Sequence, residues 1–217
     1  MSAESGIATF RGLGGLWEGI RVQDVATPEA FARDPDMVLE FYNERRRNVI
    51  AAKPNPGHIA ISKLEDLFDV VILTQNVDDL HERAGSTHIL HLHGELMKAR
   101  SSSYPDCITT LSGPELNLGD MCEYGSQLRP DIVWFGEAVP MMDSAIDEIS
   151  QADIVIVVGT SLQVYPAASL LQHIPQGIPI FLIDPNPPVL QLDNLVVLKM
   201  GAVEGLANIL QRLTSAS

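Results

Sequence analysis

The chain has 217 residues, 46% of them hydrophobic, which is enough for one sizeable α/β domain with a small appendage. Its 14 basic and 28 acidic residues give a formal net charge of −14, which repels nucleic acid and either favours lysine-rich peptide partners or serves solubility alone. No apolar run approaches the roughly 20 residues of a membrane span, and no signal-peptide pattern opens the chain. Two cysteines provide no disulfide framework. We therefore expect a cytoplasmic protein that binds neither membrane nor nucleic acid.

Two helices are predicted within a helical segment over residues 35–67. Asp34-Pro35 is an N-cap followed by proline at the first helical position, and apolar residues then recur at helical spacing as far as Val49. Asn55-Pro56 repeats this start signal for the second helix.

A buried strand is predicted next, at residues 70–73, which are apolar, largely β-branched and bounded by turn formers. Polar residues follow it abruptly, at the place where open α/β sheets bind ligands. Asp78-Asp79 can cap a short helix that stops at Gly85, and a second apolar segment, 89–92, delivers His93 to the same region.

The second half of the chain alternates again between strands and helices after a loop-rich excursion. Residues 98–128 lose periodicity, and the candidates for packing this excursion are Leu111, Leu116, Leu118 and Met121. Strands are predicted at 132–135, 154–158, 178–183 and 195–198, and helices at 141–149, 165–173 and 203–213. The pattern predicts a doubly wound parallel sheet in a single domain over residues 1–217, with residues 98–128 as a small inserted domain.

His93 is the first candidate for chemistry, because an imidazole that titrates near neutrality can accept a proton from a sugar hydroxyl. Taken alone, a histidine after an apolar segment is more often structural, and Asn76 and Asp78 can belong to a turn that only caps the helix. The remaining histidines are expected to be structural or solvated; they are His58, His81, His88, His91 and His173.

Six phrases of the chain, in order, resemble the sirtuin family of NAD-dependent protein lysine deacylases. They are AESGIATFR at 3–11, TQNVDDLHERAG at 74–85, HLHGE at 91–95, VWFGE at 133–137, GTS at 159–161 and DPN at 184–186. The resemblance covers nearly the whole chain and implies a Rossmann-like sheet of the sirtuin type.

The resemblance also implies roles for particular residues. His93 would be the general base, with Asn76 and Asp78 as further catalytic residues that orient the nicotinamide ribose and carboxamide. The cofactor would be NAD, and the expected NAD-binding residues are Ala3, Glu4, Phe10, Arg11, Gln75, Asn76, Asp78, Gly159, Thr160, Ser161 and Asn186. As a bare tripeptide, GTS is weak evidence, since any turn from strand to helix favours these residues. The implied products are free lysine, nicotinamide and O-acyl-ADP-ribose.

Acyl-lysine peptides or proteins are the implied partners. The segment expected to pair with the substrate peptide by β-augmentation comprises Val133, Trp134, Phe135, Gly136 and Glu137, and the alternative is an ordinary buried strand.

Tyr42 and Arg45 lie three residues apart on the first predicted helix and can together grip a carboxylate. With the small Ala26 upstream, this pair resembles the class III sirtuins, which remove succinyl, malonyl and glutaryl groups. The alternative is a solvated basic cluster, because Arg46 and Arg47 follow directly.

Two departures from the family pattern affect these expectations. Most sirtuins hold a structural zinc with four cysteines, and a chain with only Cys107 and Cys122 cannot form that site, so no metal is expected. The central strand and Gly-Ala-Gly turn that open the family would precede Met1, and we expect a start further upstream rather than a truncated product. The missing turn leaves a second function open, an NAD-binding regulatory protein with little turnover. A third, a protein ADP-ribosyltransferase, would use the same cofactor chemistry.

Overall fold

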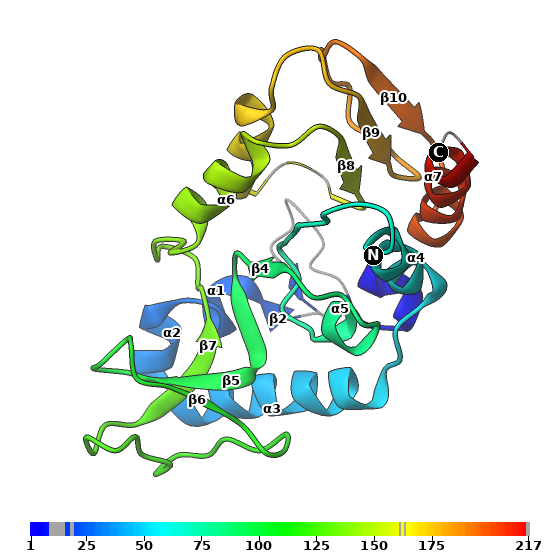
Figure 1. Cartoon of the computed structure of the whole chain (residues 1–217). Coiled ribbons are helices and arrows are strands. Elements are labelled where there is room, and N and C mark those ends of the chain that lie inside the picture. Colours follow the sequence, from blue (N-terminus) through cyan, green and yellow to red (C-terminus); the bar gives the residue numbers. More distant parts are fainter. Residues whose placement is uncertain (9–15, 18–19, 161, 163, 216–217) are drawn as a thin grey trace.

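The computed structural model describes residues 1–8, 16–17, 20–160, 162 and 164–215 (Figure 1). The first half contains η1 (Ser2–Ser5), β1 (Leu16–Trp17), β2 (Ile20–Arg21), α1 (Val22–Val25), α2 (Pro28–Arg33), α3 (Pro35–Ala51), α4 (Pro56–Leu64), β3 (Ile72–Thr74), α5 (Leu80–Arg83), β4 (Ile89–His91) and β5 (Gly94–Ser101). The second half contains β6 (Ile108–Thr110), β7 (Leu128–Ile132), α6 (Met142–Ile149), β8 (Val155–Val158), η3 (Ala167–His173), β9 (Ile180–Ile183), β10 (Leu195–Leu198) and α7 (Ala202–Ser215). The mixed α/β architecture with parallel strands confirms the predicted fold class.

The predicted helix starts are confirmed in atomic detail. The Asp34 side chain accepts a hydrogen bond from the N–H of Met37 at 3.1 Å at the start of α3. Asn55 forms a complete capping box with His58 at the start of α4. These signals are local, so the sequence carries them without reference to the rest of the fold.

The parallel strands form two sheets instead of one. β3 pairs with β4, and β8, β9 and β10 form a second sheet in the order β10-β9-β8. Among the described residues no ladder joins β3 to β8, and a cavity of about 1350 Å³ is lined by residues of both strands.

Two elements differ from the prediction. The strand expected at 132–135 is wrong, because β7 ends at Ile132 and the Glu137 carboxylate then accepts from the N–H of Trp134 at 2.8 Å, which closes a turn. Residues 167–173 form a 3₁₀ helix where an α-helix was expected.

The excursion over residues 98–128 is built on a three-stranded antiparallel sheet, β6-β5-β7, at the opposite end of the molecule from α7 (Figure 1). Leu116 is buried and Leu111 packs against the same cluster, as predicted. Leu118 and Met121 are exposed, so the prediction was wrong for these two residues. The 98–128 boundary of the small domain stays a prediction.

Hydrogen bonds to helix α3 connect this excursion to the remainder of the chain. The N–H of Leu116 donates to Asn43 Oδ1 at 3.0 Å, and Arg46 Nε donates to the carbonyl of Pro114 at 2.6 Å. Arg45 and Arg46 are buried, and only Arg47 of the three is exposed, so the alternative of a solvated basic cluster does not describe them.

Two histidines meet in the core between α4 and α5. The rings of His58 and His81 lie 4.8 Å apart in an edge-on arrangement, and His58 Nε2 and His81 Nδ1 are buried without a hydrogen-bond partner. Burial lowers the pKa of His58 to about 4, and burial together with the neighbouring His58 lowers the pKa of His81 to about 4. Both imidazoles are therefore neutral in the folded protein.

Among the described residues, no helix has the length and apolar character that a membrane crossing requires.

This pair predicts a specific loss of stability in acid. An unfolded histidine takes up its proton near pH 6.5, whereas the folded pair does so only near pH 4, so the unfolded state binds more protons between these values. The free energy of unfolding should therefore fall as pH is lowered from 6.5 to 4. The variant His81→Leu removes one of the two titrating rings and breaks no side-chain hydrogen bond among the described residues. The pair's contribution to the change of unfolding free energy with pH should therefore drop by about half.

Urea unfolding at half-unit pH steps measures this slope, and the exposed His173→Leu is the matched control. Equal slopes in the wild type and His81→Leu would contradict the assignment.

Candidate active site

The large cavity gathers most of the residues predicted to carry chemistry. It extends from the gap between β3 and β8 to the carboxyl ends of these strands. Its lining includes Ala26, Tyr42, Gln75, Asn76, Asp78, His93, Val133, Trp134, Phe135, Gly136, Glu137, Gly159 and Thr160. These residues come from distant parts of the chain and meet because parallel strands end at a common edge.

His93 lies between β4 and β5 and lines this cavity. Its Nδ1 atom is 3.3 Å from the carbonyl oxygen of Gln75, which can only accept a hydrogen bond. The proton of a neutral ring is therefore on Nδ1, and Nε2 keeps a free lone pair. Burial lowers the pKa of His93 although the Gln75 carbonyl opposes the shift, so the ring is a neutral base at physiological pH.

The polar residues after β3 are held by contacts to other segments. Gln75 Nε2 lies 3.4 Å from Thr160 Oγ1, across the gap between the two sheets. Asn76 Nδ2 donates to Ser2 Oγ at 2.9 Å. Asp78 Oδ1 accepts from the N–H of Leu80, the first residue of α5, at 3.2 Å, and Asp78 also lines the cavity. The N-cap of α5 is Asp79, whose side chain makes no capping bond.

Gly159 ends β8 at a position that excludes a side chain. Its φ is +58°, and a Cβ atom there would lie 2.8 Å from the backbone nitrogen of Met1. Its own N–H donates to the carbonyl of Ile183 at 2.9 Å. The backbone of Met1, the N-cap of η1, therefore lies close to the end of β8.

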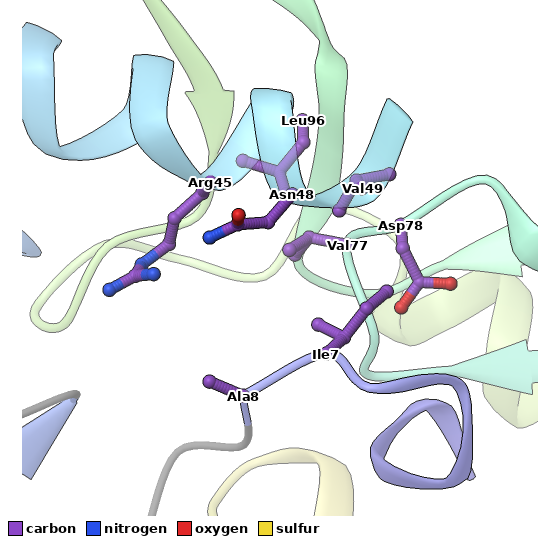
Figure 2. Close-up of a pocket in the computed structure, with 8 residues that line it drawn as sticks. All are labelled: Ile7, Ala8, Arg45, Asn48, Val49, Val77, Asp78 and Leu96. Carbon is purple, nitrogen blue, oxygen red and sulfur yellow. The ribbon is translucent and has the colours of Figure 1, made fainter. Parts of the chain in front are cut away.

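Arg45 lies in a smaller cavity of about 30 Å³ that adjoins the large one (Figure 2). Both cavities share Ile7, Ala8, Val77 and Asp78. The Arg45 guanidinium is 4.1 Å from the centre of the Phe41 ring and buried, so its charge acts with little solvent screening. Figure 2 shows Asn48, one helical turn further along α3, beside Arg45; the sequence analysis did not single out Asn48.

Several predicted cofactor residues are not brought to the cavity. Ala3 and Asn186 do not line it, and Glu4 instead caps α7, since its carboxylate accepts from the N–H of Ala202 at 2.6 Å. Phe10, Arg11 and Ser161 lie outside the described residues.

Arg129 was missed by the sequence analysis although it organises the turn after β7. It makes two hydrogen bonds to the Glu137 carboxylate at 2.8 and 2.9 Å, and its guanidinium lies 3.9 Å from the Trp134 ring centre. Although burial opposes the shift, these bonds hold the pKa of Glu137 below its ordinary value. The available signal was an arginine in the segment LRPDI at 128–132, followed eight residues later by an acid.

The same turn reaches the Arg45 region through Trp134. Trp134 Nε1 donates to the hydroxyl of Tyr42 at 2.9 Å, and both side chains are fully buried. Burial raises the pKa of Tyr42, so its hydroxyl stays protonated. The N–H groups of Val133 and Phe135 donate to the carbonyls of His93 and Ala26, both at 3.0 Å, so the predicted peptide-binding segment is already tied to the site.

Comparison with known proteins relates this arrangement to one family. The family model described as Sir2 family matches residues 1–166. The chain is 50% identical over 222 residues to an NAD-dependent protein deacylase of Bacteroides thetaiotaomicron, covering 100% of this chain and 95% of the relative. It is 49% identical over 214 residues to an NAD-dependent protein deacylase of Helicobacter pylori, covering 98% and 93%.

Solved structures of Sir2 proteins are also similar to this chain. A Sir2 homologue in complex with NAD is similar with a TM-score of 0.88 and 41% identity, covering 99% of this chain and 86% of that one. A Sir2 protein with a p53 peptide and NAD⁺ is similar with a TM-score of 0.78 and 30% identity, covering 100% and 90%.

The buried ion pair beside Trp134 yields a prediction about stability. Arg129→Leu should lower the free energy of unfolding by roughly 3 kcal/mol, because it leaves Glu137 half-buried without its partner. The matched control is Lys98→Leu, which removes a partly exposed pair with Glu95 and should cost less than about 1 kcal/mol. Urea denaturation measures both, and equal losses would show that the Arg129 pair has no special weight.

Proposed function

The chain belongs to the Sir2 family, and from that premise we propose that it is an NAD-dependent enzyme that removes acyl groups from lysine side chains of proteins. The observation that carries this proposal is the position of His93. A neutral imidazole with a free Nε2 lines the cavity where the two parallel sheets end, together with the amides of Gln75 and Asn76. A base so placed can accept a proton from a sugar hydroxyl.

The residues present fit a dinucleotide. The cavity is large by the standard of small-molecule sites, and it combines apolar strand residues with a few polar groups, as such sites do. Gly159 follows β8 with φ +58°, and the backbone amides of the loop it opens can meet a ligand's phosphate or ribose oxygens. Asn76 and Asp78 offer the donors and acceptors that a ribose and a carboxamide need. NAD, when bound, supplies a sugar carbon that becomes electrophilic as nicotinamide leaves.

The protein's own contribution is orientation and proton transfer. Gln75 fixes the tautomer of His93 through its backbone carbonyl, and its side chain contacts Thr160, which follows β8 of the other sheet. One residue thus ties the base to the segment after β8. Fixed dipoles of this kind stabilise a developing charge without reorganising during the reaction.

An acyl-lysine peptide would dock at the turn of residues 133–137, with its acyl group directed toward Tyr42 and Arg45. A relative of known structure carries a p53 peptide, which supports a peptide as partner. Two features of the acyl region favour a negatively charged acyl group: the buried guanidinium of Arg45 and the protonated hydroxyl of Tyr42. We therefore infer that succinyl and malonyl groups are preferred over acetyl.

The role of His93 is tested by nicotinamide release with an acyl-lysine peptide and NAD. His93→Ala should lose at least about 100-fold in peptide-dependent release, because the general base is gone. Its circular dichroism should match the wild type, and the exposed His173→Ala should keep full activity.

The same assay separates the competing functions. Release together with loss of the acyl mass from the peptide supports the deacylase. NAD binding without release would point to a regulatory protein, and a mass gain on a protein acceptor to ADP-ribosyl transfer. Full activity in His93→Ala would overturn the assignment of the base.

The acyl preference is tested by Arg45→Met. The variant should lose roughly 10- to 100-fold in kcat/KM for a succinyl-lysine peptide, the value of a charge-assisted hydrogen bond, and less than about threefold for the acetyl peptide. Arg47→Met is the matched control, since Arg47 lies two residues further along α3 and pairs with Glu40 and Glu115 at the surface. Equal losses on both peptides in Arg45→Met would remove the case for an acidic acyl group.

A further inference from the structure

Two turns of the β6-β5-β7 lobe lie face to face and bring its cysteines together. The first turn runs from Tyr104 to Cys107 and the second from Cys122 to Gly125, each closed by a backbone hydrogen bond of 2.9 Å. The rings of Tyr104 and Tyr124 lie 5.0 Å apart across them. The Cys107 and Cys122 thiols lie near enough for each to shift the pKa of the other.

Ser101 at the end of β5 fixes the position of both cysteines. Its N–H donates to the carbonyl of Cys107 at 2.9 Å, and its hydroxyl oxygen lies 3.3 Å from Cys122 Sγ. Cys122 is further held by a 2.8 Å bond from its N–H to the carbonyl of Ser126. Both cysteines are therefore held beside the same residue, Ser101, at the end of a strand of the antiparallel sheet.

The surroundings make the two thiols chemically unequal. Hydrogen bonding with Ser101 lowers the pKa of Cys122, whereas partial burial and the neighbouring Cys122 raise the pKa of Cys107. Both side chains are only partly buried, so a small reagent can reach them. The thiolate is the nucleophilic form, so Cys122 is the cysteine that an oxidant meets first.

We propose that Cys107 and Cys122 form an intramolecular disulfide when the protein meets hydrogen peroxide. The Cys122 thiolate attacks one peroxide oxygen, the O–O bond breaks, and hydroxide leaves, which oxidises Cys122 to the sulfenic acid. The Cys107 sulfur then attacks the Cys122 sulfur. The S–O bond breaks, the hydroxyl group leaves with the proton of Cys107 as water, and the S–S bond forms.

A metal site is the competing use for two adjacent thiols. Within the part of the chain that the structure describes, one trio of His, Cys, Asp or Glu residues has its ligand atoms within mutual reach, and it consists of Glu82, His91 and Glu95. No such trio includes Cys107 or Cys122, whereas a closed tetrahedral zinc site needs four ligands. Two thiols supply only half of the ligands of such a zinc site, so a disulfide is the favoured use of these cysteines.

The cross-link would close a ring that contains residues 108–121. Pro114 and Leu116 of this ring bind Arg46 and Asn43 of α3. Oxidation would thus restrain the segment that packs on the helix of Tyr42 and Arg45. Such a ring mainly restricts the unfolded chain, so the folded protein should gain stability.

The experiment treats the full-length protein with a slight molar excess of hydrogen peroxide and follows its intact mass and its non-reduced peptides. The wild type should lose about 2 Da and yield one peptide pair joined through Cys107 and Cys122, and dithiothreitol should reverse both changes. Its Tm should rise by roughly 5 °C on oxidation. Non-reducing gels should show monomer throughout.

Single variants test the division of roles between the thiols. Cys107→Ser should keep the sulfenic acid on Cys122, seen as a gain of about 16 Da and a dimedone adduct. Cys122→Ser should react at least about fivefold more slowly. Disulfide-linked dimers in the wild type, peroxide adducts without a cross-link, or one equivalent of zinc bound through both thiols would each overturn the proposal.

Discussion

The bidentate ion pair between Arg129 and Glu137 is the interaction on which the site depends most. It closes the turn after β7 and places the guanidinium of Arg129 over the Trp134 ring, whose indole N–H donates to Tyr42. Backbone N–H groups of this turn also bond the carbonyls of His93 and Ala26. The turn of residues 133–137, Tyr42 and His93 are therefore positioned by one buried charge pair, which is costly to break from either side.

The second constraint is the division of the parallel strands into two sheets. With no ladder between β3 and β8 in the described residues, the halves of the site meet through side chains and through η1. Gln75 reaches Thr160, Asn76 reaches Ser2, and Met1 lies against Gly159. In the described residues these polar contacts, rather than a shared strand ladder, connect the segments that follow β3 and β8.

Features that depend on local interactions could be predicted from the sequence, and features that depend on contacts between distant residues could not. The starts of α3 and α4 were predictable because Asp34 and Asn55 bond residues within one helical turn. The strand at 132–135 was wrong because the Glu137 contact overrides an apolar pattern, and Leu118 and Met121 are exposed although they are apolar. Of the residues expected around NAD, Glu4 turned out to cap α7, a contact across 198 residues that no local pattern reveals.

The sequence by itself determined the α/β class, the family and the approach of His93 to the carboxyl end of β3, because these are written in short motifs and in the spacing of apolar residues. Tertiary structure alone decided that Arg129 packs on Trp134, that Arg45 is buried beside a cavity, and that Cys107 and Cys122 both contact Ser101. These facts depend on contacts between segments remote in the chain. The free energy of such contacts comes from burial and pairing, which a linear pattern does not record.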